Sequence, residues 1–132
     1  MKQFILALAI AATVMACNNN TGYKVAEDGQ EAATEFIKAT LEGNYDKASF
    51  YMYKDSLGTN QMVLDKWKKD YDLLPNADKV RFKNASIIVK NIEKANDSLV
   101  NFTYVNSYRN IQQTIKVIRD NNIWLVDLKD IH

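Results

Sequence analysis

Residues 99–128 read LVNFTYVNSYRNIQQTIKVIRDNNIWLVDL, in which apolar and polar side chains alternate on either side of two asparagine-containing turns. A period of two is typical of β-strands that are buried on one face. The turns fall at Arg109-Asn110 and at Asp120-Asn121-Asn122, where asparagine adopts positive φ at little cost. The pattern predicts three antiparallel strands joined by hairpins. Their expected limits are 99–108, 111–119 and 123–128.

An earlier part of the chain has the same character. Residues 85–92 are rich in β-branched side chains and lead into the turn sequence Ala95-Asn96-Asp97. Val80 and Phe82 also alternate, so the extended part of the chain is expected to begin close to residue 80. The second half of the chain is therefore predicted to be an antiparallel meander.

The segment from Asp28 to Leu74 has a helical period instead. Asp28 followed by Glu31 resembles a capping box, and Gly43 suits the left-handed end of a first helix. Helices followed by a meander predict an α+β fold in which N-terminal helices pack on a curved antiparallel sheet. The other expected helices run from Asn44 to about Gly58, and from Thr59 or Asn60 to Pro75.

The single cysteine, Cys17, ends an apolar run that begins at Phe4 behind a positively charged head. The run is too short to span a bilayer and is typical of a secretory signal. Val14-Met15-Ala16-Cys17 resembles the bacterial lipobox, whose cysteine is acylated after cleavage. We interpret residues 1–16 as a lipoprotein signal peptide and Cys17 as the lipidation site. An ordinary secretory signal with an unpaired cysteine is the alternative interpretation.

Residues 17–28 would then be the acylated cysteine and a flexible tether, because this segment is polar and aperiodic. Residues 29–132 form one domain of ordinary size. In many Gram-negative bacteria an aspartate after the lipidated cysteine retains a lipoprotein at the inner membrane, and Asn18 is not that signal. We therefore expect a cell-envelope protein held by its lipid, with the outer membrane as the default location.

The charge pattern and the scarcity of metal ligands exclude several classes of function. The 17 basic and 16 acidic residues are interleaved, so no basic face for nucleic acid is expected. One cysteine cannot form an internal disulfide or a thiolate metal cluster. The one histidine, His132, is the last residue of the chain. Neither a metal nor a cofactor is therefore expected.

Two short patterns resemble the nuclear transport factor 2-like superfamily, whose members are cystatin-like α+β cones. One joins the first two helices as apolar–Gly–Asx–aromatic–Ala, and the other is a turn–Trp–x–Val ending. Over residues 29–130 the chain is similar to small bacterial lipoproteins of unknown function related to lumazine-binding-like domains. The matching residues are Phe36, Leu41, Gly43, Tyr45 and Ala48 in the first pattern, and Asn122, Trp124 and Val126 in the second.

The resemblance implies a cone whose apolar cavity binds a ligand. We expect a non-catalytic module for a small apolar ligand or an envelope protein; an assembly partner that uses its exposed sheet face is another possibility. Aromatic side chains at these spacings also suit core packing, which is the alternative role for each of them. The candidate ligand-binding residues are Tyr51, Trp67, Tyr71, Tyr104 and Trp124.

The superfamily also contains isomerases and dehydratases, which would use a carboxylate and a tyrosine here. Tyr51 and Asp55 lie four residues apart, so they share a face if the second helix continues through both. Asp55 is expected near the helix end, ionised at its ordinary pKa, and we therefore predict no enzyme and no catalytic residue. The other residues considered for catalysis are Tyr53, Tyr104 and Asp127.

Overall fold

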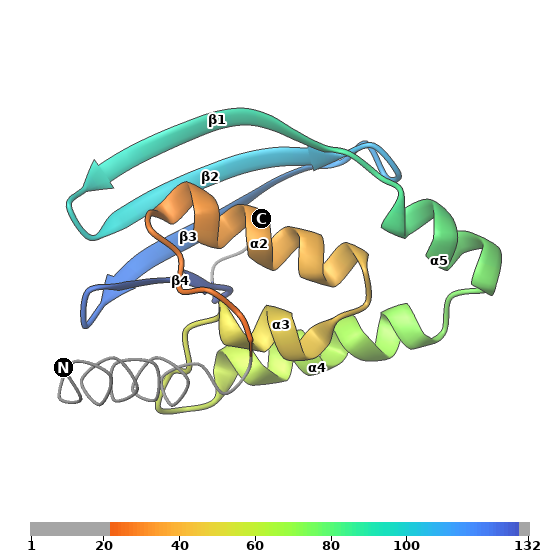
Figure 1. Ribbon diagram of the computed structural model, residues 1–132, viewed down its shortest axis with the longest axis horizontal. Coiled ribbons are helices and arrows are strands. Elements are labelled where there is room, and N and C mark those ends of the chain that lie inside the picture. Colours follow the sequence, from red (N-terminus) through yellow and green to blue (C-terminus); the bar gives the residue numbers. More distant parts are fainter. Residues whose placement is uncertain (1–21, 130–132) are drawn as a thin grey trace, which may run out of the picture.

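The computed structural model describes residues 22–129, which form helices followed by a four-stranded antiparallel sheet (Figure 1). This order confirms the predicted α+β class. The predicted signal peptide, Cys17 and His132 lie outside the described residues. Within residues 22–129, no helix has the length and apolar character that crossing a membrane requires. The elements are α2 (Gly29–Leu41), α3 (Tyr45–Phe50), α4 (Thr59–Asp72), α5 (Asn76–Lys83), β1 (Ile87–Asn96), β2 (Leu99–Asn106), β3 (Gln112–Asp120) and β4 (Ile123–Asp127).

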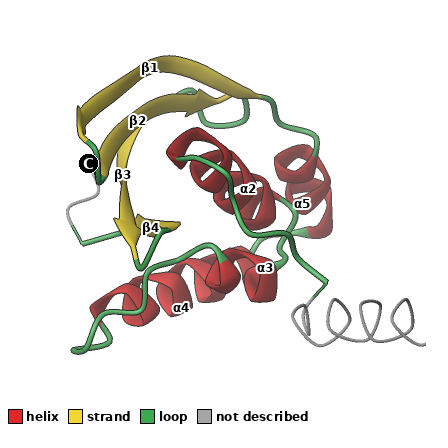
Figure 2. Ribbon diagram, turned by 60° about the vertical axis from the view of Figure 1, so that its left-hand side comes forward, coloured by secondary structure: helices red, strands yellow, loops and turns green. Residues whose placement is uncertain are grey.

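The sheet is a meander in the order β1-β2-β3-β4, and each strand pairs with its neighbour in sequence. Positive φ angles at Asn110, Asn121 and Asn122 confirm the predicted role of asparagine in the turns. Phe102 lies opposite Ile115 across β2 and β3, and both are buried. The sheet curves around α2, and α3 and α4 lie on the far side of α2 from β1 and β2 (Figure 2).

Helix α2 is the centre of the core, and its start follows the predicted capping pattern. The Asp28 carboxylate accepts a hydrogen bond from the Glu31 backbone N–H at 2.8 Å. The Glu31 carboxylate in turn accepts from the backbone N–H of Glu27, one residue earlier than in a standard capping box. At the other end Gly43 has φ +74°, as predicted for a left-handed helix end.

A buried amide connects the start of α4 to the last strand. Asn60 is fully buried, and its Nδ2 donates to the Tyr53 carbonyl at 2.9 Å and to the Asp127 carboxylate at 3.1 Å. Its Oδ1 accepts from the backbone N–H of Leu128 at 2.9 Å. Because each of these polar groups has its partner, the contact stabilises a buried junction that would otherwise carry a desolvation cost.

A short connection extends the sheet beyond β4. Met52 and Val126 form an isolated parallel bridge. The backbone N–H of Tyr53 donates to the Val126 carbonyl, and that of Val126 donates to the Tyr51 carbonyl, both at 2.8 Å. The chain after α3 therefore covers part of the outer edge of β4.

Three predicted limits were wrong. The second helix was expected to run to about Gly58, but α3 ends at Phe50. Residues 80–83 are helical, because α5 runs from Asn76 to Lys83 after Pro75. Val80 is 58% exposed, so its alternation with Phe82 does not reflect a buried face. Strand β1 continues to Asn96, which moves the turn to residues 97–98.

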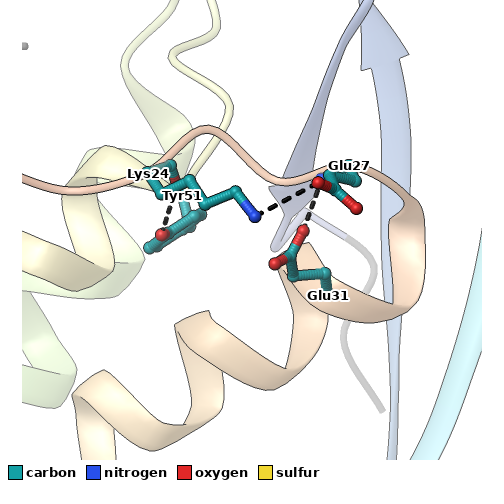
Figure 3. Close-up of polar contacts among 4 residues, drawn as sticks. All are labelled: Lys24, Glu27, Glu31 and Tyr51. Carbon is teal, nitrogen blue, oxygen red and sulfur yellow. Dashed lines mark hydrogen bonds and ion pairs between the residues drawn. The ribbon is translucent and has the colours of Figure 1, made fainter.

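The segment before α2 also differs from the flexible tether expected for residues 17–28. Its described part packs on the domain, with Ala26 only 7% exposed. The rings of Tyr23 and Phe50 lie 5.6 Å apart. The Tyr51 hydroxyl donates to the Lys24 carbonyl at 2.6 Å (Figure 3). The packed domain therefore begins close to Tyr23 rather than at residue 29.

Candidate functional site

A pocket of about 280 Å³ lies where α2 and α4 end, between α5 and the loop that joins β2 to β3. Its floor is formed by the buried side chains of Ile37, Thr40 and Leu41, at the end of α2. The other lining residues come from α3, α4 and the turn that follows it, α5, β2, β3 and the loop between these two strands. They are Tyr45, Lys66, Trp67, Asp70, Tyr71, Leu74, Phe82, Tyr104, Asn106, Arg109, Ile111 and Gln113.

Aromatic rings form much of the pocket wall. Trp67 and Tyr71 lie four residues apart on α4, so they share one face of that helix. The ring of Tyr71 lies 6.0 Å from that of Tyr45 and 6.2 Å from that of Phe82. These separations suit favourable aromatic contacts and hold rings from three helices together around the pocket.

Two tyrosine hydroxyls in the wall are protonated at neutral pH and donate within the protein. Burial raises the pKa of Tyr104 to about 12, and its hydroxyl donates to Gln113 Oε1 at 2.8 Å. Burial, followed by the nearby Tyr71 and Asp72, raises the pKa of Tyr45 to about 12. The Tyr45 hydroxyl donates to a main-chain carbonyl of α4, that of Trp67, at 3.3 Å.

The charged lining residues differ in how they are paired. Lys66 and Asp70 form an ion pair at 3.0 Å, and both side chains are more than half exposed. The guanidinium of Arg109 lies 5.7 Å from the centre of the Phe82 ring, a cation–π contact. Arg109 forms no ion pair with a carboxylate of residues 22–129.

The structure places three of the five predicted ligand-binding residues in the pocket: Trp67, Tyr71 and Tyr104. Tyr51 does not line it, because its buried ring packs on Phe50 and its hydroxyl is bonded to the segment before α2. Trp124 does not line it either. That half-buried indole lies beside the start of α2, with the Arg119 guanidinium 5.9 Å from its ring centre.

Several lining residues were not predicted as site residues. Tyr45 belongs to the sequence pattern that joins the first two helices. That pattern was the only feature of the sequence that singled it out. Phe82 lies in the segment wrongly expected to be extended, so its packing against Tyr71 was not foreseen. The polar residues Asn106, Arg109 and Gln113 lie at and beside a turn, where composition alone does not separate a binding residue from a solvated one.

Of the residues considered for catalysis, Tyr104 lines the pocket, whereas Asp55 and Asp127 lie outside it and have structural roles. The Asp55 carboxylate accepts from the backbone N–H groups of Asn60 at 2.9 Å and Thr59 at 3.0 Å, and these bonds lower its pKa. Because α3 ends at Phe50, Tyr51 and Asp55 do not share a helix face. Asp127 is bonded to Asn60. Residues 22–129 contain no group of His, Cys, Asp and Glu side chains placed to hold a metal ion.

No protein-family model, curated protein or solved structure matches this chain. The geometry of the pocket therefore carries the functional interpretation.

Proposed function

We propose that this protein is a lipid-anchored protein of the bacterial cell envelope whose domain binds a small, largely apolar ligand without transforming it. The observation that carries the proposal is the pocket of about 280 Å³ with a wall of aromatic side chains. Small-molecule sites are typically concave, mainly apolar and supplied with a few polar groups. The volume is close to the lower end of the usual range, which favours a small molecule over a peptide segment.

The polar groups of the pocket support binding without catalysis. An isomerase-like reaction would use a carboxylate whose pKa is raised by apolar surroundings. The carboxylate among the described lining residues is Asp70, which is more than half exposed and paired with Lys66 at 3.0 Å. Its surroundings are therefore solvent and an ammonium group rather than the apolar side chains that such a reaction requires.

The lipid anchor and the fold family are part of the proposal. The Val14–Cys17 sequence supports lipidation at Cys17 and delivery to the envelope, with the outer membrane as the expected location. The curved sheet around α2 agrees with a cystatin-like cone of the nuclear transport factor 2-like superfamily. The resemblance quoted above supports that assignment.

Fluorescence can test the pocket directly, because the chain has two tryptophans and one of them lines it. A Trp124→Phe variant leaves Trp67 as the only reporter. The neutral apolar dye N-phenyl-1-naphthylamine should quench Trp67 in a saturable way with one site per molecule. Quenching that never saturates would contradict the proposal.

A matched pair of variants locates the binding. Tyr71→Ala removes a ring from the pocket wall and should weaken dye binding by about tenfold, the effect of losing roughly 1.4 kcal/mol of contact. Tyr53→Ala removes a tyrosine that does not line the pocket and should leave the affinity unchanged. Equal losses in both variants would place the dye elsewhere.

A further inference from the structure

Two side-chain amides line the pocket, and each uses its carbonyl oxygen within the protein. The Oδ1 of Asn106 accepts from the backbone N–H of Arg109 at 2.8 Å. A backbone N–H can only donate, so this contact fixes which way the amide points. The Oε1 of Gln113 accepts from the hydroxyl of Tyr104, also at 2.8 Å.

What these two amides leave for a ligand is a set of donors. Within residues 22–129, neither Asn106 Nδ2 nor Gln113 Nε2 has a hydrogen-bond partner. Asn106 is nonetheless only 9% exposed, so its amide is held in place by its surroundings. Arg109 adds a guanidinium, which carries donors and no acceptor. These three side chains therefore present donors that a ligand with a hydrogen-bond acceptor could use.

The charges beside the pocket also favour an anionic ligand. Lys66 and Asp70 neutralise each other, whereas Arg109 adds a positive charge without a carboxylate partner in the described part of the chain. The ammonium of Lys79, which does not itself line the pocket, lies 5.3 Å from the centre of the Tyr71 ring. An anion is attracted here, while a cationic ligand would meet like charges.

We infer that the ligand is a small organic anion, with an aromatic or otherwise apolar body and a single anionic group such as a carboxylate. Its body lies against Trp67 and Tyr71, and its anionic group faces Arg109 and the amides of Asn106 and Gln113. Charge-assisted hydrogen bonds of this kind are shorter and stronger than neutral ones. The inference rests on the proposed function and adds the charge of the ligand to it.

Two dyes with the same apolar body separate the contribution of ligand charge to the affinity from that of the apolar pocket. N-phenyl-1-naphthylamine is neutral, and 1-anilinonaphthalene-8-sulfonate carries one anionic group on the same framework. We expect the anionic dye to bind about tenfold more tightly, the gain from roughly one charge-assisted contact. This advantage should shrink as salt is raised from 50 to 500 mM, because the contact lies close to solvent.

Two arginines provide a matched pair of variants, because both guanidinium groups lie over an aromatic ring. Arg109→Gln should cost the anionic dye about tenfold and leave the neutral dye within twofold of its original affinity. Arg119→Gln removes the same charge beside Trp124, outside the pocket, and should affect neither dye. Gln113→Glu keeps an acceptor for Tyr104 but adds a negative charge, so it should also weaken the anionic dye alone.

The outcomes distinguish the inference from the function on which it rests. Tighter binding of the anionic dye that is lost in Arg109→Gln and in Gln113→Glu supports the inference. If the neutral dye binds as tightly, or if Arg119→Gln has the same effect as Arg109→Gln, the inference is overturned and the apolar site stands. Failure of both dyes to bind overturns the site and the inference together.

Discussion

Gly43 lies so close to Tyr71 that a Cβ at position 43 would be 2.5 Å from the Cζ and Oη atoms of that ring. The left-handed residue that ends α2 is therefore in direct contact with the wall of the pocket. Any side chain at position 43 would displace the Tyr71 ring, and with it the contacts to Tyr45 and Phe82.

We expect Gly43→Ala to lower both stability and ligand affinity. The φ of +74° costs alanine about 1–2 kcal/mol, and the collision with Tyr71 adds to this cost. Gly58→Ala is the matched control, because Gly58 has φ +72° but nothing within 4 Å of a built Cβ. Chemical denaturation of both variants measures the difference. A loss no larger at position 43 than at position 58, with unchanged dye affinity, would contradict this account.

Replacement of the buried amide at the junction of α4 and β4 should be costly. Asn60→Leu preserves the volume but leaves the Leu128 N–H and the Tyr53 carbonyl without partners. We expect a loss of about 2–4 kcal/mol in the free energy of unfolding, since each buried unpaired group costs about 1–3 kcal/mol. Asn91→Leu, on the exposed strand β1, should change stability by less than about 0.5 kcal/mol. A cost at Asn60 no larger than that at Asn91 would show that water replaces the lost partners.

The segment before α2 should contribute to stability although it was expected to be a tether. A chain that begins at Asp28 loses the buried Ala26 and the ring contact of Tyr23. Compared with a chain that begins at Gly22, we expect a loss of about 2 kcal/mol, or roughly 10 °C in melting temperature.

A double-mutant comparison connects that loss to one hydrogen bond. Tyr51→Phe should cost about 1 kcal/mol in the longer chain, because its hydroxyl donates to the Lys24 carbonyl. In the shorter chain the acceptor is absent, so the same substitution should cost close to nothing. Equal costs in the two chains would mean that the bond is not a source of stability.

The acid stability of the domain should depend on Asp55. Backbone hydrogen bonds from Asn60 and Thr59 lower its pKa, so the ionised carboxylate stabilises the folded state. For a lowered pKa, this stabilisation is present above the unfolded value of about 4 and is lost as the pH falls through the folded value. The gap in melting temperature between the wild type and Asp55→Ala should therefore shrink below pH of about 4. Asp97→Ala, at a carboxylate that is 98% exposed, is the matched control for the removal of one acidic side chain. A gap that stays constant down to pH 2.5 would contradict the role given to Asp55.

Lipidation at Cys17 predicts how the full chain partitions in cells. Cys17→Ser should move the protein from the detergent-rich phase of a phase-separated extract to the aqueous phase, because the acyl chains supply the membrane affinity. Incorporation of radiolabelled palmitate should disappear in the same variant. Asn18→Ser, the neighbouring substitution, should change neither result. A Cys17→Ser protein that stays wholly in the detergent phase would exclude the lipid anchor.

The sequence predicted the sheet well because its register is set locally. Each hairpin contains its own turn, and Asn110, Asn121 and Asn122 adopt the positive φ that their residue type favours. The helix starting at Asp28 was predictable for the same reason, since its cap lies within a few residues. Helix α5 was not predictable in this way. Val80 and Phe82 alternate as in a strand, but Val80 is exposed, so the alternation does not mark a buried face.

The pocket was predicted in part, because helical spacing places Trp67 and Tyr71 on one face without stating what they face. Whether Tyr51 meets a ligand or the backbone of Lys24 depends on a contact between residues 27 positions apart. The donor set of Asn106, Arg109 and Gln113 depends on a loop that returns over the end of α2. Such long-range contacts are decided by tertiary packing, which local sequence patterns do not encode.

The bridge between Met52 and Val126 bears on how this sheet meets other molecules. A fibre can grow by strand addition only if every molecule has two open sheet edges, so that each edge pairs with a different neighbouring molecule. Here the outer edge of the short strand β4 is partly occupied by the molecule's own chain, which leaves β1 as the long open edge. Pairing of two β1 strands about a two-fold axis uses up that edge in both molecules, so such an assembly closes at two copies. Residues 51–53, in the connection after α3, thus protect an exposed sheet against polymerisation.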